Sequence, residues 1–164
     1  MKIISNYLNL STFNELKKFV FSNELPLFYH DKIVGDESVN ETNDFMFNHV
    51  FFDKNKQHSD YFNFIMMPIL GKLNLNYLIR AKLNCYVKKE KHVHTKMDVD
   101  YDSNHTVGLF SFNTCNGYTF FNDTNEKIKS IENQMIIFDG NRKHCSVSQT
   151  DSNLRINVNI NFIW

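Results

Sequence analysis

The sequence has few of the residues that interrupt or cross-link a chain. Its 164 residues include 5 Gly, 2 Pro and 3 Cys. The cysteines, Cys85, Cys115 and Cys145, are widely spaced and form no Cys-x-x-Cys pair, which argues against a disulfide framework and against a zinc site. So little Gly and Pro leaves no flexible linker, and we expect a single domain over residues 1–164.

An excess of charge and long apolar runs are also missing. The formal net charge is +0, so there is no electrostatic footprint of a nucleic-acid partner. No apolar run approaches the ~20 residues of a membrane span, and the first residues lack the apolar core of a signal peptide. These patterns predict a soluble, cytoplasmic protein without a membrane partner, and they give no information on its oligomeric state.

Hydrophobic periodicity predicts two helices in the first half. One begins near Ser11–Thr12, with Glu15 as a capping-box partner of Thr12, and it carries apolar residues at helical spacing. The second follows Ser59 and continues to about Leu73, where Pro68 predicts either a kink or a late start. The polar segment 31–56 between them is interpreted as a surface excursion or a substrate-covering loop.

From Leu78 onward the apolar residues alternate with polar ones, which is typical of strands. Short helices followed by many strands predict an α+β fold, mainly β, arranged as a sandwich or barrel. Residues 1–77 would form helical support and a loop, and residues 78–164 the β core. The predicted strands are Leu78–Lys88, Thr106–Asn113, Tyr118–Asn122, Gln134–Asp139, Lys143–Ser148 and Leu154–Phe162.

Four residues suggest a metal and an anion site. Asp98 and Asp100 are two apart, so on a strand they face the same way and can address one ion. His144 offers an imidazole ligand, and a site of His and carboxylate ligands with open positions is typical of oxygen-activating Fe(II). Arg155 lies eleven residues after His144, and its planar fork matches a carboxylate.

The same region resembles a known family. The stretches around the two acids, then His105-Thr106-Val107-Gly108-Leu109-Phe110, Asn116-Gly117-Tyr118-Thr119, Lys143-His144 and Arg155-Ile156-Asn157-Val158-Asn159, carry the resemblance. Together they resemble the 2-oxoglutarate/Fe(II)-dependent oxygenases of the prolyl-hydroxylase-like type, in particular short members from marine bacteria and phages. The order of elements before residue 80 is also similar, so the resemblance covers most of the chain.

The resemblance implies a double-stranded β-helix (jelly roll) with N-terminal supporting helices, Fe(II) as metal and 2-oxoglutarate as cosubstrate. Asp100 matches the metal carboxylate and His144 the distal metal histidine. Asp98 falls where the family has its first metal histidine. Arg155 matches the residue that pairs with the distal carboxylate of 2-oxoglutarate, and Asn157 and Ser111 join it as cosubstrate contacts. The implied activity is hydroxylation of a small-molecule or peptidyl substrate.

Two positions depart from the family. Asp98 adds a negative charge to a site that must accept a dianion, and like charges near 4 Å repel by about 4 kcal/mol at an effective dielectric of 20. Ser111 replaces a tyrosine that helps to hold the cosubstrate in many relatives. Three alternatives therefore stay open: a catalytically lapsed jelly-roll binding protein, a Mn²⁺ or Mg²⁺ variant of the site, and His94 as substitute ligand. A calcium loop over residues 98–109 is disfavoured because it lacks the required Gly and Glu.

Overall fold

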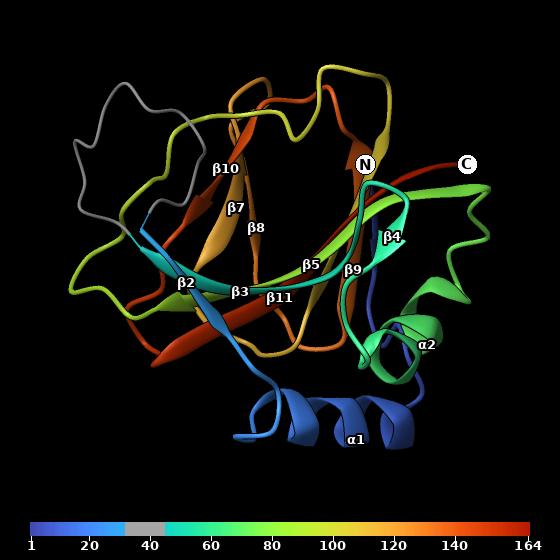
Figure 1. The fold of residues 1–164 in the computed structure, drawn as a ribbon. Coiled ribbons are helices and arrows are strands. Elements are labelled where there is room, and N and C mark those ends of the chain that lie inside the picture. Colours follow the sequence, from blue (N-terminus) through green and yellow to red (C-terminus); the bar gives the residue numbers. More distant parts are fainter. Residues whose placement is uncertain (32–44) are drawn as a thin grey trace.

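The protein, described here from a computed structural model, is a β-sandwich with its helices on one side (Figure 1). The structure describes residues 1–31 and 45–164. The helices are α1 (Leu10–Val20), the π-helical turn η1 (Phe62–Met66) and α2 (Met67–Leu70). The strands are β1 (Lys2–Ile4), β2 (Phe28–His30), β3 (Met46–Asp53), β4 (Lys56–Gln57), β5 (Tyr77–Val87), β6 (Thr106–Ser111), β7 (Tyr118–Phe121), β8 (Glu126–Lys129), β9 (Gln134–Asp139), β10 (His144–Val147) and β11 (Leu154–Ile163).

Two antiparallel sheets build the jelly roll that the sequence predicts. The large sheet has the order β1-β9-β6-β11-β5-β3-β2, with β4 attached to β3, and the small sheet has the order β10-β7-β8. Crossovers between strands distant in sequence, such as β11 between β5 and β6, are typical of such a sandwich. In Figure 1 the small sheet lies above the large sheet, and α1 and α2 lie below it.

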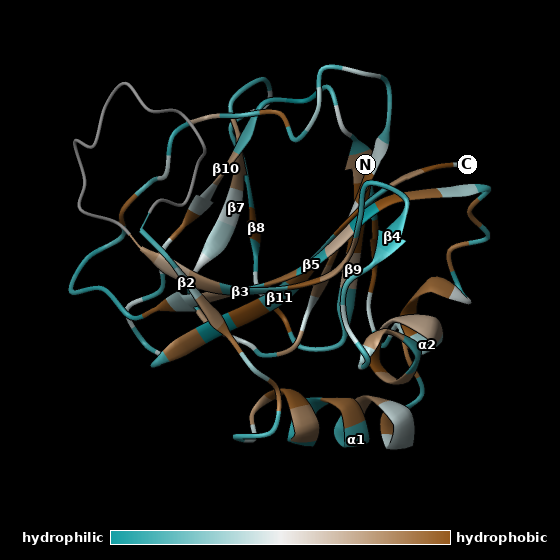
Figure 2. Ribbon diagram, viewed as in Figure 1, coloured by the Kyte–Doolittle hydropathy of each residue, from teal (hydrophilic) through white to brown (hydrophobic). Residues whose placement is uncertain are grey.

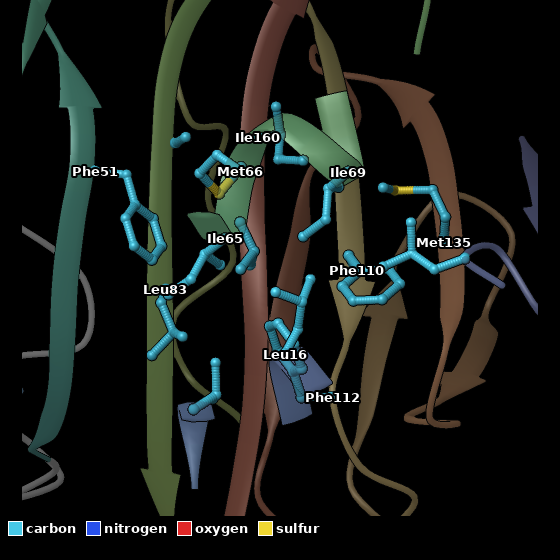
Figure 3. Close-up of a cluster of buried hydrophobic side chains, with 14 of the residues drawn as sticks. Leu16, Phe51, Ile65, Met66, Ile69, Leu83, Phe110, Phe112, Met135 and Ile160 are labelled. Carbon is cyan, nitrogen blue, oxygen red and sulfur yellow. The ribbon is translucent and has the colours of Figure 1, made fainter. Parts of the chain in front are cut away.

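The two faces of the large sheet differ because its central strands alternate in polarity. Ile156, Val158 and Ile160 of β11 pack into the main apolar cluster with Leu16 of α1 and Ile69 of α2. Figure 3 shows this cluster between the helices and the sheet. The intervening residues of β11, which are polar, face the small sheet, and Figure 2 shows the alternation as brown and teal bands. The alternation of apolar and polar residues along β11 therefore separates a face toward the core from a face toward the cavity.

The first helix begins earlier than predicted. Its N-cap is Asn9, whose Oδ1 accepts the Thr12 backbone N–H at 2.9 Å, so Thr12 is not the cap and no capping box with Glu15 starts the helix. Asn is as good an N-cap as Thr, because its side-chain oxygen reaches the same free amides. Pro68 marks a late start of the second helix, which is one of the two alternatives that its position suggested.

Five strands were missed, namely β1, β2, β3, β4 and β8. Residues Met46–Asp53, which we expected in a surface loop, form β3 and pair with β5. The rest of that expected loop falls largely on residues 32–44 and lies outside the described residues. Strands β1, β2 and β8 also lie where no strand was predicted, and β4 is a two-residue strand that pairs with β3. The β core thus recruits strands from before residue 78, because β1 pairs with β9 and β3 with β5. In the described part of the chain, no helix is long and apolar enough to cross a membrane.

Candidate functional site

A cavity of about 110 Å³ lies between the two sheets. This volume is several times the ~10–15 Å³ that a single water molecule requires, so a small organic ligand can enter. The large sheet, the small sheet and the segment between β5 and β6 all contribute to its wall. The polar residues of this wall are Lys82, Asn84, Tyr86, Thr95, Lys96, Asp98, Asp100, Thr119, His144, Ser146, Arg155, Asn157 and Asn159.

Arg155 brings a buried positive charge to this cavity. Its residue surface is 2% exposed. Nη1 donates to Ser146 Oγ at 2.8 Å and to the Val147 carbonyl oxygen at 3.2 Å, and Nη2 donates to Thr119 Oγ1 at 3.3 Å. Among the described residues, no carboxylate pairs with the guanidinium. A buried charge without a counterion is costly, so an anion that enters the cavity gains a strong partner.

Unsatisfied polar atoms surround the same space. The buried atoms Asn84 Oδ1, Asn159 Oδ1 and Arg155 Nε have no hydrogen-bond partner among the described residues. Asn157 also lines the cavity, and its Oδ1 accepts from Asn84 Nδ2 at 3.3 Å. Because buried polar groups are normally hydrogen-bonded, these atoms indicate a place for a polar ligand or for ordered water.

Asp98 and His144 lie next to each other on the cavity wall. Their backbones form a hydrogen-bonded antiparallel pair, with both N–H···O distances at 3.0 Å. Residues paired in this way have Cβ atoms ~5 Å apart on the same face, within reach of one ion. His144 Nδ1 donates to the Arg142 carbonyl oxygen at 3.0 Å, which leaves Nε2 as the nitrogen available to a ligand.

Asp100 lines the same cavity, but its carboxylate has other partners. Oδ1 accepts from Arg80 at 2.8 Å, and Oδ2 accepts from Asn161 at 2.9 Å and from Asn159 at 3.1 Å. Burial alone would raise the pKa of the Asp100 carboxyl. The Arg80 charge, the two amides and nearby His144 outweigh this effect, so the pKa lies below its usual value and the group is ionised.

The expected Fe(II) site is therefore formed only in part. Asp98 and His144 fit a metal as neighbouring oxygen and nitrogen donors. Asp100 does not fit in this arrangement, because Arg80 and two amides already hold its oxygens. Among the described residues, no group of three or more His, Cys, Asp or Glu side chains is placed to hold a metal ion. We expected Asp98, Asp100 and His144 to converge on one metal ion, and the described residues do not form this three-ligand site.

Two other candidates lie outside the cavity wall. Ser111 pairs with Asn157 across β6 and β11 and is buried, yet it does not line the cavity. His94 pairs with Val147 at the outside of the small sheet, where its Nδ1 lies 3.7 Å from Cys145 Sγ, and it does not line the cavity either. The structure therefore gives no support to His94 as a substitute ligand or to Ser111 as a contact of a ligand in this cavity.

Tyr86 provides a phenol group beside Arg155. Ser111, which stands where many relatives have a tyrosine, provides none. The Arg155 guanidinium lies over the Tyr86 ring, 5.5 Å from its centroid. Burial raises the pKa of the Tyr86 phenol, so it remains a neutral hydrogen-bonding group. The sequence offered one signal for it, since Tyr86 shares the polar face of its strand with Arg80, Lys82 and Asn84.

Lys82 is the second cation of the large sheet at the cavity. It lies on β5 opposite Asn159 of β11 and lines the wall. Burial, with a smaller effect of Arg80, lowers the pKa of the Lys82 ammonium to about 8, although Asp100 and Asp53 act in the opposite direction. Sequence reasoning missed Arg80 and Lys82 as site residues, because alternation alone does not say which face of β5 meets the small sheet.

Comparisons with known proteins identify the fold. No protein-family model and no curated protein matches the chain. A prolyl hydroxylase of Trichoplax adhaerens, in complex with a peptide fragment of hypoxia-inducible factor, matches with a TM-score of 0.67 at 12% identity, covering 99% of this chain and 82% of that chain. A prolyl-4-hydroxylase of Pseudomonas putida matches with a TM-score of 0.61 at 12% identity, covering 99% and 92%.

A third structure has a different activity on the same architecture. A non-haem α-ketoglutarate-dependent epimerase from nogalamycin biosynthesis matches with a TM-score of 0.66 at 10% identity, covering 98% of this chain and 76% of that chain. At such low identity the likeness establishes the architecture, and the function is argued from the cavity. The chain has the jelly-roll fold of the prolyl-hydroxylase-like 2-oxoglutarate/Fe(II) oxygenases.

Proposed function

We propose that this protein is a 2-oxoglutarate-dependent oxygenase of the prolyl-hydroxylase-like type that hydroxylates a small-molecule or peptidyl substrate. The observation that carries the proposal is Arg155, a buried guanidinium without a carboxylate partner among the described residues, on the wall of a cavity in this fold. Such a charge is explained by an anionic ligand, and 2-oxoglutarate supplies a carboxylate that matches the guanidinium fork.

The residues of the cavity have distinct roles in this proposal. Arg155 holds the distal carboxylate, and the neutral phenol of Tyr86 lies beside it as a further hydrogen-bonding group. Asn157 also lines the cavity, and its Nδ2 group can donate to an oxygen of the ligand while its Oδ1 accepts from Asn84. Enclosure between the two sheets limits water at the ligand, which strengthens each of these electrostatic contacts.

Asp98 and His144 are the proposed protein ligands of the metal, with Fe(II) as the leading candidate and Mn²⁺ or Mg²⁺ as alternatives. Fe(II) bound together with 2-oxoglutarate supplies oxygen activation that is coupled to cosubstrate decarboxylation and to hydroxylation of a C–H bond. The chain's own part is to hold the cosubstrate, to present one imidazole nitrogen and one carboxylate, and to keep the space dry.

The molecules bound in two structural neighbours belong to two classes, peptides and small molecules. One neighbour binds a peptide fragment, and the epimerase is also known in complex with Fe³⁺, α-ketoglutarate and the small molecule nogalamycin RO. Both classes remain candidates for this chain.

Turnover of 2-oxoglutarate tests the proposal. Protein loaded with Fe(II) without oxygen is mixed with 2-oxoglutarate and air, and succinate is measured. We expect slow succinate formation by the wild type, a KM for 2-oxoglutarate raised roughly 30-fold or more in Arg155→Met, and a smaller rise in Arg155→Lys. The exposed Lys129→Met variant controls for loss of a cation at the surface and should behave as the wild type. A wild type that neither binds nor consumes 2-oxoglutarate would disprove the proposal.

The second candidate is a binding protein that uses the same cavity without chemistry. The ion pair of Asp100 with Arg80 favours it, because that pair removes a metal carboxylate from use. In the assay above this candidate gives 2-oxoglutarate binding that depends on Arg155, without succinate at any concentration of Fe(II).

A further inference from the structure

The charges at the cavity favour an anion even before a metal is considered. The lining includes the cations Arg155 and Lys82 and the anions Asp98 and Asp100, and Arg80, which is not part of the lining, pairs with Asp100. Lys96 also lines the wall, and it has an interaction of its own. Because Arg80 and Asp100 neutralise each other at 2.8 Å, the charges that remain for a ligand are those of Lys82, Arg155 and Asp98.

Lys82 lacks an ion-pair partner within the described parts of the chain. None of the salt bridges among the described residues includes Lys82, and the nearby carboxylate of Asp100 is held by Arg80. Lys82 is half-buried, and it lines the cavity beside Asn84 and Asn159. Withdrawing an ammonium from water without a counterion costs stability, and an anionic ligand in the cavity would offset that cost.

The positions of the two cations suit the two ends of one small dianion. Lys82 and Tyr86 are four residues apart on the same face of β5, which is about 13 Å along a strand. Arg155 pairs with Tyr86 across β5 and β11, and Lys82 pairs with Asn159. Both side chains are long and line the same cavity, so their charged ends can approach one ligand from its two ends.

We propose that Lys82 and Arg155 form a two-point clamp for a short dicarboxylate of the 2-oxo acid type, and that the cavity binds this ligand without a metal ion. The choice of 2-oxoglutarate as ligand rests on the proposed function. In a metal-dependent site the ion attracts the keto-acid end of the ligand. Here Lys82 supplies that positive charge, and it also offsets the negative charge that Asp98 adds.

Calorimetric titration of 2-oxoglutarate into the full chain in EDTA tests the clamp. Four proteins are compared: wild type, Lys82→Met, Lys82→Arg and the surface control Lys129→Met. We expect the wild type and Lys129→Met to bind alike. Lys82→Met should bind roughly 30-fold or more weakly, and Lys82→Arg should recover much of the loss. Glutarate, with two carboxylates, and butyrate, with one, are titrated as probes. The wild type should bind glutarate more tightly than butyrate, and Lys82→Met should bind the two with similar, weak affinity.

The same titration with Mn²⁺ in place of EDTA separates the failure of the clamp from the failure of the proposed function. Binding of 2-oxoglutarate only with Mn²⁺ would overturn the clamp and leave the proposed function standing. Metal-free binding that is lost in Arg155→Met but unchanged in Lys82→Met would also overturn the clamp, because Arg155 alone would then account for it. No binding under either condition would overturn both. Thermal unfolding of each variant confirms that weak binding is not loss of fold.

Discussion

Replacing Lys82 by Met should make the folded protein more stable while it weakens ligand binding. Burial, with Arg80, lowers the pKa of the Lys82 ammonium from 10.5 to about 8. One pKa unit corresponds to 1.36 kcal/mol, so at pH 7 the folded state loses about 3 kcal/mol by holding this group charged. Met keeps most of the apolar stem and removes the charge, and it should therefore recover much of that free energy.

The pH dependence of this gain has a defined sign. Between pH 8 and 10.5 the unfolded chain binds a proton at Lys82 that the folded chain has released, so wild-type stability from this group rises with pH in that window. The advantage of Lys82→Met should therefore be about 3 kcal/mol at pH 7 and about 1 kcal/mol at pH 9.5. Urea unfolding at the two pH values measures it, with Lys129→Met as control.

Two results would refute this reasoning. If Lys82→Met is less stable than the wild type at pH 7, Lys82 makes a stabilising contact that outweighs its burial. If the difference between the two proteins does not change with pH, the Lys82 ammonium is not buried as described. A gain in stability together with a loss of 2-oxoglutarate affinity is the pattern expected of a residue kept for a ligand.

Three further substitutions test other parts of the structure. Asp98→His should tighten Mn²⁺ binding in calorimetry, because a second imidazole removes a negative charge from beside His144; unchanged affinity would place Asp98 outside the metal site. Asp100→Asn should cost about 2–3 kcal/mol in urea unfolding at pH 7. Since the pKa of Asp100 is lowered, this cost should disappear as pH falls below about 4, and a cost that persists in acid would contradict the ion pair with Arg80. Asn9→Ala should cost about 1 kcal/mol through the lost cap, whereas Ser11→Ala should cost less.

The sequence predicted much of the β core because period-two alternation is a local signal. Strand β9 has the predicted bounds, and the alternation of Ile with Asn in the predicted strand Leu154–Phe162 corresponds to the apolar and polar faces of β11. Strand β3 was missed because polar Asn48 and His49 interrupt its apolar pattern. The structure buries both, and His49 does so with hydrogen bonds to Pro26 and Ser59 that no local pattern reveals.

The cavity was predictable only in part, since its chemistry depends on partners that are distant in sequence. The motif positions led to Arg155 and to the neighbours Asp98 and His144, which the structure places on one wall. The pairing of Asp100 with Arg80 could not be predicted, because it depends on how the segment before β6 crosses the face of β5. Lys82 and Tyr86 were predicted only as residues of an alternating strand. Their place in the cavity depends on the distant strand β11 and on the small sheet, which the local pattern does not reveal.

The most direct test of the central claim is an experimental structure of the protein with 2-oxoglutarate in the presence of EDTA. We predict that the ligand lies between the sheets, with one carboxylate on the guanidinium of Arg155 and the other end near the ammonium of Lys82. A structure at saturating 2-oxoglutarate in which the cavity holds only water, or in which the ligand binds elsewhere, would contradict the claim.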